Sequence, residues 1–262
     1  MTRLLQILGF AALGIFILLP LAQVVLLSFL STLPRDEIAK GSFTLLNYAN
    51  VVRTDRLLAS LANSILYVSL NVVICLAVAL PAAYAFSRYR FRGARAAFLA
   101  LLIFRVTPPI VLSLPVFLVF SEVHLLNTPV AVALAHCVFN IPIAIWILEG
   151  FISSVPRELD ESAFVDGHST PSFILRHLVP VIAPGIGAAA FFCFMFSWVE
   201  VVFARTLTIT AGKPITTAIS SLFGFQTDIG LVMAMTVLSL IPGLAVIWLV
   251  RTHISRGFTI RV

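Results

Sequence analysis

The chain has 262 residues, of which 60% are hydrophobic and only 11% are charged. A soluble domain carries roughly 25% charged residues, and a soluble core of this size could not bury so much apolar surface. The composition therefore predicts an integral membrane protein and excludes a disordered chain; three cysteines are too sparse for a disulfide scaffold. The net charge of +6 does not indicate nucleic-acid binding, because the arginines flank apolar runs.

Six apolar runs are long enough to cross a bilayer, which takes about 20 residues. We predict an all-α polytopic membrane protein with six transmembrane helices and a single domain over residues 1–262. The first run is too long for the apolar part of a cleaved signal peptide, so we expect a permanent anchor. The third run is interrupted by one arginine and three prolines. The runs are Ile7–Leu30, Ala59–Phe86, Ala96–Phe120, Pro129–Leu148, Ala183–Phe203 and Ile229–Val250.

The distribution of basic residues predicts the orientation of these runs. With the N-terminus in the cytoplasm, ten Lys and Arg residues fall in inside segments, six in outside segments and Arg105 within a run. Residues 88–95, in the short loop after the second run, hold four arginines and no acid. Because short basic loops stay in the cytoplasm, both termini are predicted to be cytoplasmic.

The long inside segment, residues 149–182, begins with the pattern of a short amphipathic helix. Pro156 favours a helix start, and the acidic residues that follow it suit the first turn of a helix. One apolar stripe is formed by Val155, Leu159 and Ala163.

A second short helix is predicted in the same segment. Gly167 should end the first helix, and a new start follows with Ser169 or Thr170 as the cap and Pro171 at the first position. We expect Pro180 to end this second helix. The apolar faces of such a helix pair must be buried, which can happen against its own membrane domain, in the lipid interface or against a partner protein. The acidic residues favour a basic groove on a partner.

This segment resembles the EAA loop of ABC importer permeases. Residues 161–167 read E-S-A-F-V-D-G where the family has E-A-A-x-x-D-G, and Pro180 follows nineteen residues after Glu161. The resemblance implies the type I ABC importer permease fold, with residues 149–182 as the cytoplasmic coupling loop. In the family, this loop inserts into a groove of a separate ATPase subunit, whose closure switches the permease between inward and outward access.

The resemblance implies a role for each matching residue. Glu161 should pair with a basic residue of the groove, and Gly167 should allow a sharp turn. Asp166 is expected to accept hydrogen bonds from the start of the second helix. Ser162 replaces the commoner Ala, and we expect His168 to be exposed rather than to contact the ATPase. The expected coupling residues are Glu161, Ser162, Ala163, Asp166, Gly167, His168 and Pro180.

Further segments resemble the carbohydrate-uptake branch, in particular its maltose-type second permease subunit. The resemblance therefore implies a sugar, a polyol or a glycerol phosphate as the substrate. Two departures are Val199, where the branch usually has Asn, and the absence of a Gly-x-x-Lys-Gly ending after Gly257. The matching segments are residues 63–64, 83–93, 108–109, 125–129 and 196–200.

The resemblance also implies an assembly in a prokaryotic cytoplasmic membrane. Its members would be a second homologous permease chain, two ATPase subunits and an external substrate-binding protein, with no nucleic acid. ATP would bind to the ATPase partner, so no cofactor is expected in this chain. Neither G-x-x-x-x-G-K-[ST], H-E-x-x-H nor G-x-S-x-G is present, and no His/Cys cluster has metal spacing. We therefore expect no enzymatic activity and no metal site.

Arg105 is the most unusual polar residue within the runs. It lies ten residues after Arg95, or about 15 Å along a helix, which places it near the bilayer midplane. A charge there is costly and indicates function, and Pro108 and Pro109 should break the helix beside it. We expect Arg105 to line the substrate path or to pair with Glu200; the alternative is that it reaches the interface.

Other polar side chains in the runs suit a sugar, which is bound by hydrogen bonds and by stacking on aromatic rings. Each of them can alternatively join neighbouring helices. His136 could act as a proton relay only with an acid beside it, and no acid lies near it in the sequence. Asn71 and His136 are further candidates. The main substrate-path candidates are Arg105, Asn63, Asn140, Ser197, Trp198 and Glu200.

Two functions of other classes stay open at this point. A secondary transporter or channel that works without ATP would need acids or a histidine relay within the membrane, whereas the acids lie mostly in loops. A membrane scaffold whose loop recruits a soluble protein is opposed by Arg105 and by the proline-broken third run.

Overall fold

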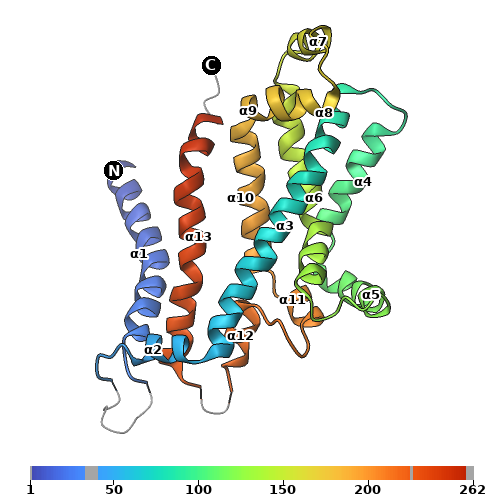
Figure 1. The fold of residues 1–262 in the computed structure, drawn as a ribbon. Helices are drawn as coiled ribbons and strands as arrows, with labels where there is room; N and C mark the ends of the chain where they lie inside the picture. The colour runs from blue at the N-terminus through green and yellow to red at the C-terminus, as the bar shows by residue number, and fades with distance from the viewer. Residues whose placement is uncertain (1, 33–40, 225–226, 258–262) are drawn as a thin grey trace. The chain divides into compact units, whose positions relative to one another are not determined.

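The computed structural model describes residues 2–32, 41–224 and 227–257. Within them the regular secondary structure is helical (Figure 1), apart from one isolated β-bridge between Leu30 and Phe43. Four helices contain segments long and apolar enough to cross a membrane. They are α1 (Thr2–Ser28), α3 (Asp55–Arg88), α6 (Pro129–Ser153) and α13 (Ile229–Gly257).

Two further pairs of helices pass the same test when joined, but both are sharply bent. Helices α4 (Ala94–Val106) and α5 (Pro109–Glu122) meet at 98°. The segment Thr170–Val181 meets α10 (Ala183–Val199) at 87°. The described residues thus hold four spanning helices, or six spans if each bent pair is one. The six-span count and the position of the termini stay predictions.

The predicted break in the third run is confirmed and has a local cause. Thr107, which precedes Pro108, is extended with φ −63° and ψ 128°, as a residue before proline prefers. Pro108 is extended too, and Pro109 then opens α5 at a position where its missing N–H costs nothing. The apolar stretch therefore turns sideways instead of continuing as one helix.

Contacts divide the chain into two compact units, and the first comprises Met1–Ala62 and Pro214–Pro242. It contains the short helices α2 (Leu46–Arg53) and α12 (Ile215–Ser221). The buried Asn47 of α2 donates hydrogen bonds to the carbonyls of Ser28 and Leu30, both at 2.9 Å. These bonds satisfy carbonyl groups left open where α1 ends.

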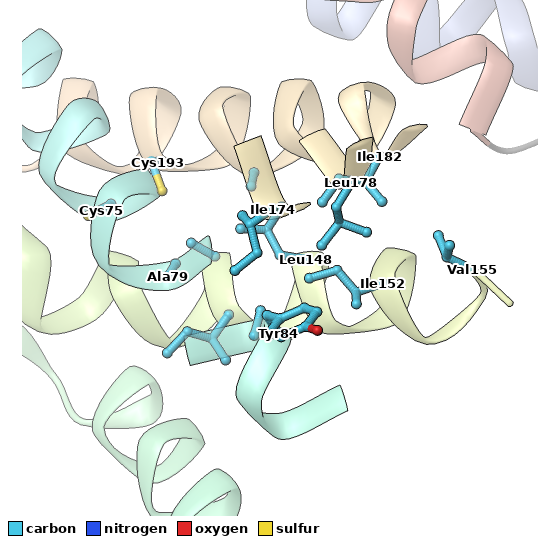
Figure 2. Packing of buried hydrophobic residues seen from close by; sticks show 14 of the residues in the cluster. Cys75, Ala79, Tyr84, Leu148, Ile152, Val155, Ile174, Leu178, Ile182 and Cys193 are labelled. Atoms are coloured by element: carbon cyan, nitrogen blue, oxygen red, sulfur yellow. The ribbon is translucent and has the colours of Figure 1, made fainter. Parts of the chain in front are cut away.

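The second unit comprises Asn63–Lys213 and Gly243–Val262, and its main core lies around α6. Helix α6 packs against α10 and α4. The core also contains small buried residues, among them Cys75 and Ala79 on α3 and Cys193 on α10, and such residues allow helices to pack closely. Figure 2 shows these residues with larger ones such as Leu148, which fill the centre of the cluster. All three cysteines are free and buried.

Gly185 of α10 packs directly against Phe151 of α6. A Cβ atom added at Gly185 would lie 2.4 Å from Cγ of Phe151. That distance is far below van der Waals contact, so the phenylalanine ring occupies the space that a side chain would need.

We therefore expect Gly185→Ala to destabilise the protein by about 1–3 kcal/mol, because it overpacks this contact. The measurement is the midpoint of thermal unfolding in detergent. Gly150→Ala is the matched control, since a Cβ at Gly150 meets no atom within 4 Å. Its midpoint should stay the same or rise slightly, because alanine is the better helix former. Equal midpoints for the two variants would contradict the close approach.

Candidate functional site

The long loop forms a helix pair, as predicted, with shifted boundaries. Helix α6 extends to Ser153, five residues past the predicted end of the fourth run, because nothing in residues 149–153 stops a helix. The first loop helix, α7 (Glu158–Val165), begins two residues after Pro156, which lies instead in the preceding turn. The apolar stripe is confirmed: Val155 and Ala163 are buried and Leu159 is half-buried.

Gly167 ends α7 as predicted, through a turn that closes two hydrogen bonds. Its φ of +83° is left-handed, a conformation that glycine adopts without steric cost. The amide of Gly167 donates to the carbonyl of Phe164 at 3.1 Å, and the amide of His168 donates to that of Ala163 at 3.0 Å. This pair of bonds is the Schellman arrangement, which satisfies the last carbonyls of a helix.

The second loop helix differs from the prediction at its end. Ser169 is its N-cap, and the helix runs through α8 (Thr170–Phe173), the π-helical turn η1 (Ile174–Leu178) and α9 (Val179–Val181). Pro180 was expected to end the helix, but it lies within α9. The wide turn before it, in which the amide of Val179 donates to the carbonyl of Ile174, makes room for the proline ring.

Helix α7 has two unlike faces. Asp160 and Ala163 are buried, at 6% and 4% exposure, and face the rest of the second unit. Glu161 and Ser162 are exposed, and Val165 is 87% exposed. Among the described residues the Glu161 carboxylate has no bonding partner. The residues that the resemblance assigns to ATPase contact therefore lie mainly on the open face, whereas Ala163 packs inward.

Two expectations for this turn are wrong. The Asp166 side chain accepts no hydrogen bond from the following helix within the described residues and is exposed, because the Schellman bonds already close the turn. His168 is half-buried rather than exposed: its ring lies 4.6 Å from that of His177. Its Nδ1 also lies 3.2 Å from Oγ of Ser172.

A buried polar cluster joins the base of α7 to the end of α3, and the sequence reasoning missed it. Asp160 lies 2.9 Å from Nε of Arg88, and the hydroxyl of Tyr84 donates to Asp160 at 3.1 Å. Arg88 also donates to the carbonyl of Val155 at 3.0 Å. The sequence did hold a signal, because Asp160 lies beside the buried stripe of α7. Arg88 was read only as a topology signal.

A cavity of about 360 Å³ lies between α4, α6 and α10 in the second unit. It brings together three substrate-path candidates that are far apart in the sequence: Arg105, Asn140 and Glu200. Phe196 and His136 add an aromatic ring and an imidazole to the lining. Asn63, Ser197 and Trp198 do not line it.

Glu200 lies at the break after α10, where it organises the cavity wall. Its carboxylate accepts hydrogen bonds from three backbone N–H groups at the start of α11 (Val202–Leu207), at 2.7–3.2 Å. It also pairs with Nε2 of His136 at 3.0 Å, while Nδ1 of the same ring lies 2.5 Å from Oγ of Ser197. His136 therefore does have an acid beside it, although 64 residues separate the two.

Arg105 presents its charge to the same cavity without an acid partner. Its guanidinium carbon lies 3.9 Å from the centroid of the Phe196 ring, which is a cation–π contact. Within the described residues Arg105 forms no ion pair, and Glu200 is paired with His136. Of the two predicted roles, lining a path agrees with this position and pairing with Glu200 does not.

The remaining polar candidates mainly join helices. The Asn140 amide donates to Oδ1 of Asn71 at 2.8 Å and to the carbonyl of Cys193 at 3.3 Å, which ties α6 to α3 and α10. Asn63 donates to the carbonyl of Lys213 at 3.3 Å. Trp198 stacks on Phe194 with ring centroids 5.5 Å apart. Among the residues that the structure describes, no group of three His, Cys, Asp or Glu side chains could hold a metal.

Apolar helices long enough to cross a membrane, two sharp helix breaks and a cavity that holds Arg105, Asn140 and Glu200 are features expected of a membrane transport protein. Residues 75–259 match the family model of the binding-protein-dependent transport system inner membrane component. The chain belongs to this family. Family membership favours the importer over the secondary-transporter and scaffold alternatives. The protein is a multi-pass membrane protein.

Known relatives and a solved structure agree with this membership. The chain is 29% identical to the trehalose transport system permease protein SugB of Mycobacterium tuberculosis, over 93% of the chain and 91% of the relative. It is 32% identical to the osmoprotective compounds uptake permease protein GgtD of Synechocystis, over 82% and 73%. A chain of a bacterial ABC transporter that imports alginate has the same fold, with a TM-score of 0.76 at 22% identity over 95% and 96%. The expected type I permease fold is confirmed.

The turn at Gly167 gives a prediction about backbone conformation. A Cβ at this position would meet open space, so only the positive φ opposes a side chain. Gly167→Val should cost about 1–2 kcal/mol of local stability, whereas Gly167→Asn should cost less, because asparagine tolerates this region. Hydrogen exchange of the backbone amides at positions 167 and 168 measures the opening of the turn. Equal protection in the two variants would contradict the left-handed turn.

Proposed function

We propose that this chain is the translocation subunit of an ATP-driven importer for a carbohydrate or polyol, with α7 as its coupling helix. The observation that carries the proposal is the open face of α7, where Glu161 stands exposed and has no partner among the described residues. An exposed carboxylate beside the 87% exposed Val165 suits a basic groove with an apolar floor. The match of residues 161–167 to the family loop supports the same role.

The proposed assembly contains a second homologous permease chain, two ATPase subunits and a substrate-binding protein on the outer side of a prokaryotic cytoplasmic membrane. ATP binds to the ATPase subunits, and this chain acts as a transport component rather than as an enzyme. The four arginines of residues 88–95 favour six spans with both termini in the cytoplasm. Residues 258–262, where the Gly-x-x-Lys-Gly ending is absent, lie outside the described residues.

A sugar or polyol substrate is supported by two lines of argument. Relatives named for trehalose and for osmoprotective compounds resemble the chain over most of its length. The cavity near Arg105 offers a guanidinium, an aromatic ring and an amide, the groups that bind hydroxyl-rich ligands. Its volume of about 360 Å³ falls within the usual range for ligand sites.

The coupling role predicts that Glu161→Ala abolishes ATP-driven uptake while membrane insertion stays normal. The reason is that the variant removes the carboxylate expected to pair with the ATPase groove. The measurement is co-purification of the ATPase in mild detergent, followed by ATP hydrolysis and uptake of a panel of sugars that starts with trehalose and maltose.

The matched control is Glu122→Ala, which removes an exposed acid at the end of α5 and should leave co-purification and uptake unchanged. Undiminished uptake in Glu161→Ala would overturn the coupling assignment. If the wild-type chain purified without an ATPase and without a second permease, the proposed importer function would be overturned.

If Arg105 lines the substrate path, Arg105→Met should impair substrate binding rather than coupling to the ATPase. Loss of a charged donor should raise the apparent KM for the sugar transported by the wild type about tenfold, with the ATPase still bound. Arg95→Met is the control, because it removes an exposed arginine from the same helix without touching the cavity. An unchanged KM in Arg105→Met would exclude this residue from the path.

A further inference from the structure

We propose that Tyr84, Arg88 and Asp160 form a latch that passes the movement of the coupling helix to helix α3. The inference rests on the proposed function, because it takes α7 as the helix held by the ATPase. It adds positioning residues that act inside this chain, behind the face that contacts the partner.

The latch joins two helix ends of opposite polarity. Arg88 is the last residue of α3, where the helix dipole favours a cation, and Asp160 lies in the first turn of α7, where it favours an anion. Tyr84 precedes Arg88 by four residues, so both side chains leave the same face of α3. The ring of Tyr84 also lies 6.0 Å from that of Phe173 in α8. The C-terminal end of α3 thus contacts both loop helices.

Burial makes the charge contact costly to separate. The side chains of Arg88 and Asp160 are 7% and 8% exposed. Nε of Arg88 and Oδ2 of Asp160 lie 2.9 Å apart as an ion pair, and within the described residues neither atom has a hydrogen bond to any other group. If α7 moved away from α3, both charges would be left buried without compensation. The pair therefore favours movement of the two helices together.

Helix α3 connects the latch to the cavity. Helix α3 runs from Arg88 back to Asn71, about 26 Å along its axis, and remains helical through Pro81, which lacks the N–H for one backbone hydrogen bond. Asn71 accepts the hydrogen bond from Asn140, and Asn140 lines the cavity beside Arg105. A displacement of α7 can therefore reach the cavity wall through one helix and one pair of amides.

The test breaks the latch without leaving a buried charge. The double variant Arg88→Met with Asp160→Leu replaces the ion pair by apolar side chains, an exchange that usually preserves stability. Val199 is an exposed residue of the cavity lining. The complete complex is prepared with Val199→Cys, and a maleimide that reacts with this cysteine is the probe. The rate of labelling is compared with and without ATP. The same complex without Val199→Cys gives the background of the three buried native cysteines.

We expect the double variant to keep its ATPase subunits and their ATP hydrolysis. The ATP-induced change in labelling rate should fall about tenfold, within the range usual for coupling between sites. Arg88→Lys, which keeps the cation, should retain most of the response. The controls are Arg90→Met and Glu158→Gln, which change exposed side chains at the same two helix ends and should respond fully.

Each outcome has a distinct meaning. A full ATP response in the double variant would overturn the latch. Loss of the ATPase subunits together with the response would also overturn it, because the cluster would then only maintain the fold. A parent complex that lacks any ATP response would overturn the proposed function, and the latch with it.

Discussion

A break in an apolar helix leaves backbone groups that lipid cannot satisfy, and this constraint shapes the second unit. At the break after α10, the Glu200 carboxylate accepts from three amides of α11 and is held in place by His136. Asn127 has a similar role, since its side chain accepts from the amide of Thr210 at 2.9 Å. The polar residues near the cavity thus serve the fold first, which leaves Arg105 as the group most available to a ligand.

The sequence predicts those features that depend on neighbours within one or two helical turns. The stripe of Val155, Leu159 and Ala163 and the stop at Gly167 follow from spacing and from the conformational freedom of glycine, and the structure has both. Pro180 shows the limit of such rules. A proline excludes a regular helix turn, but a local widening to a π-helix lets the helix continue, and no residue preference announces it.

The contacts that define the two candidate sites could not be predicted from the sequence, because they join residues far apart along the chain. Glu200 meets His136 across 64 positions, and Asp160 meets Tyr84 across 76. A single sequence gives no sign of which distant acid faces which base. Burial was the deciding quantity for Asp160: in sequence it is one of several acids in a polar segment, and the packing of α7 turns it inward.

The buried pair of Arg88 and Asp160 constrains how this protein can change over evolution. Losing one charge strands the other in a site with almost no solvent, whereas replacing both by apolar groups is nearly neutral. A single substitution at either position therefore produces a disfavoured protein, whereas substitution of both residues together does not. The two positions, 72 residues apart, should covary among homologues, with either an ion pair or two apolar residues and few mixed combinations.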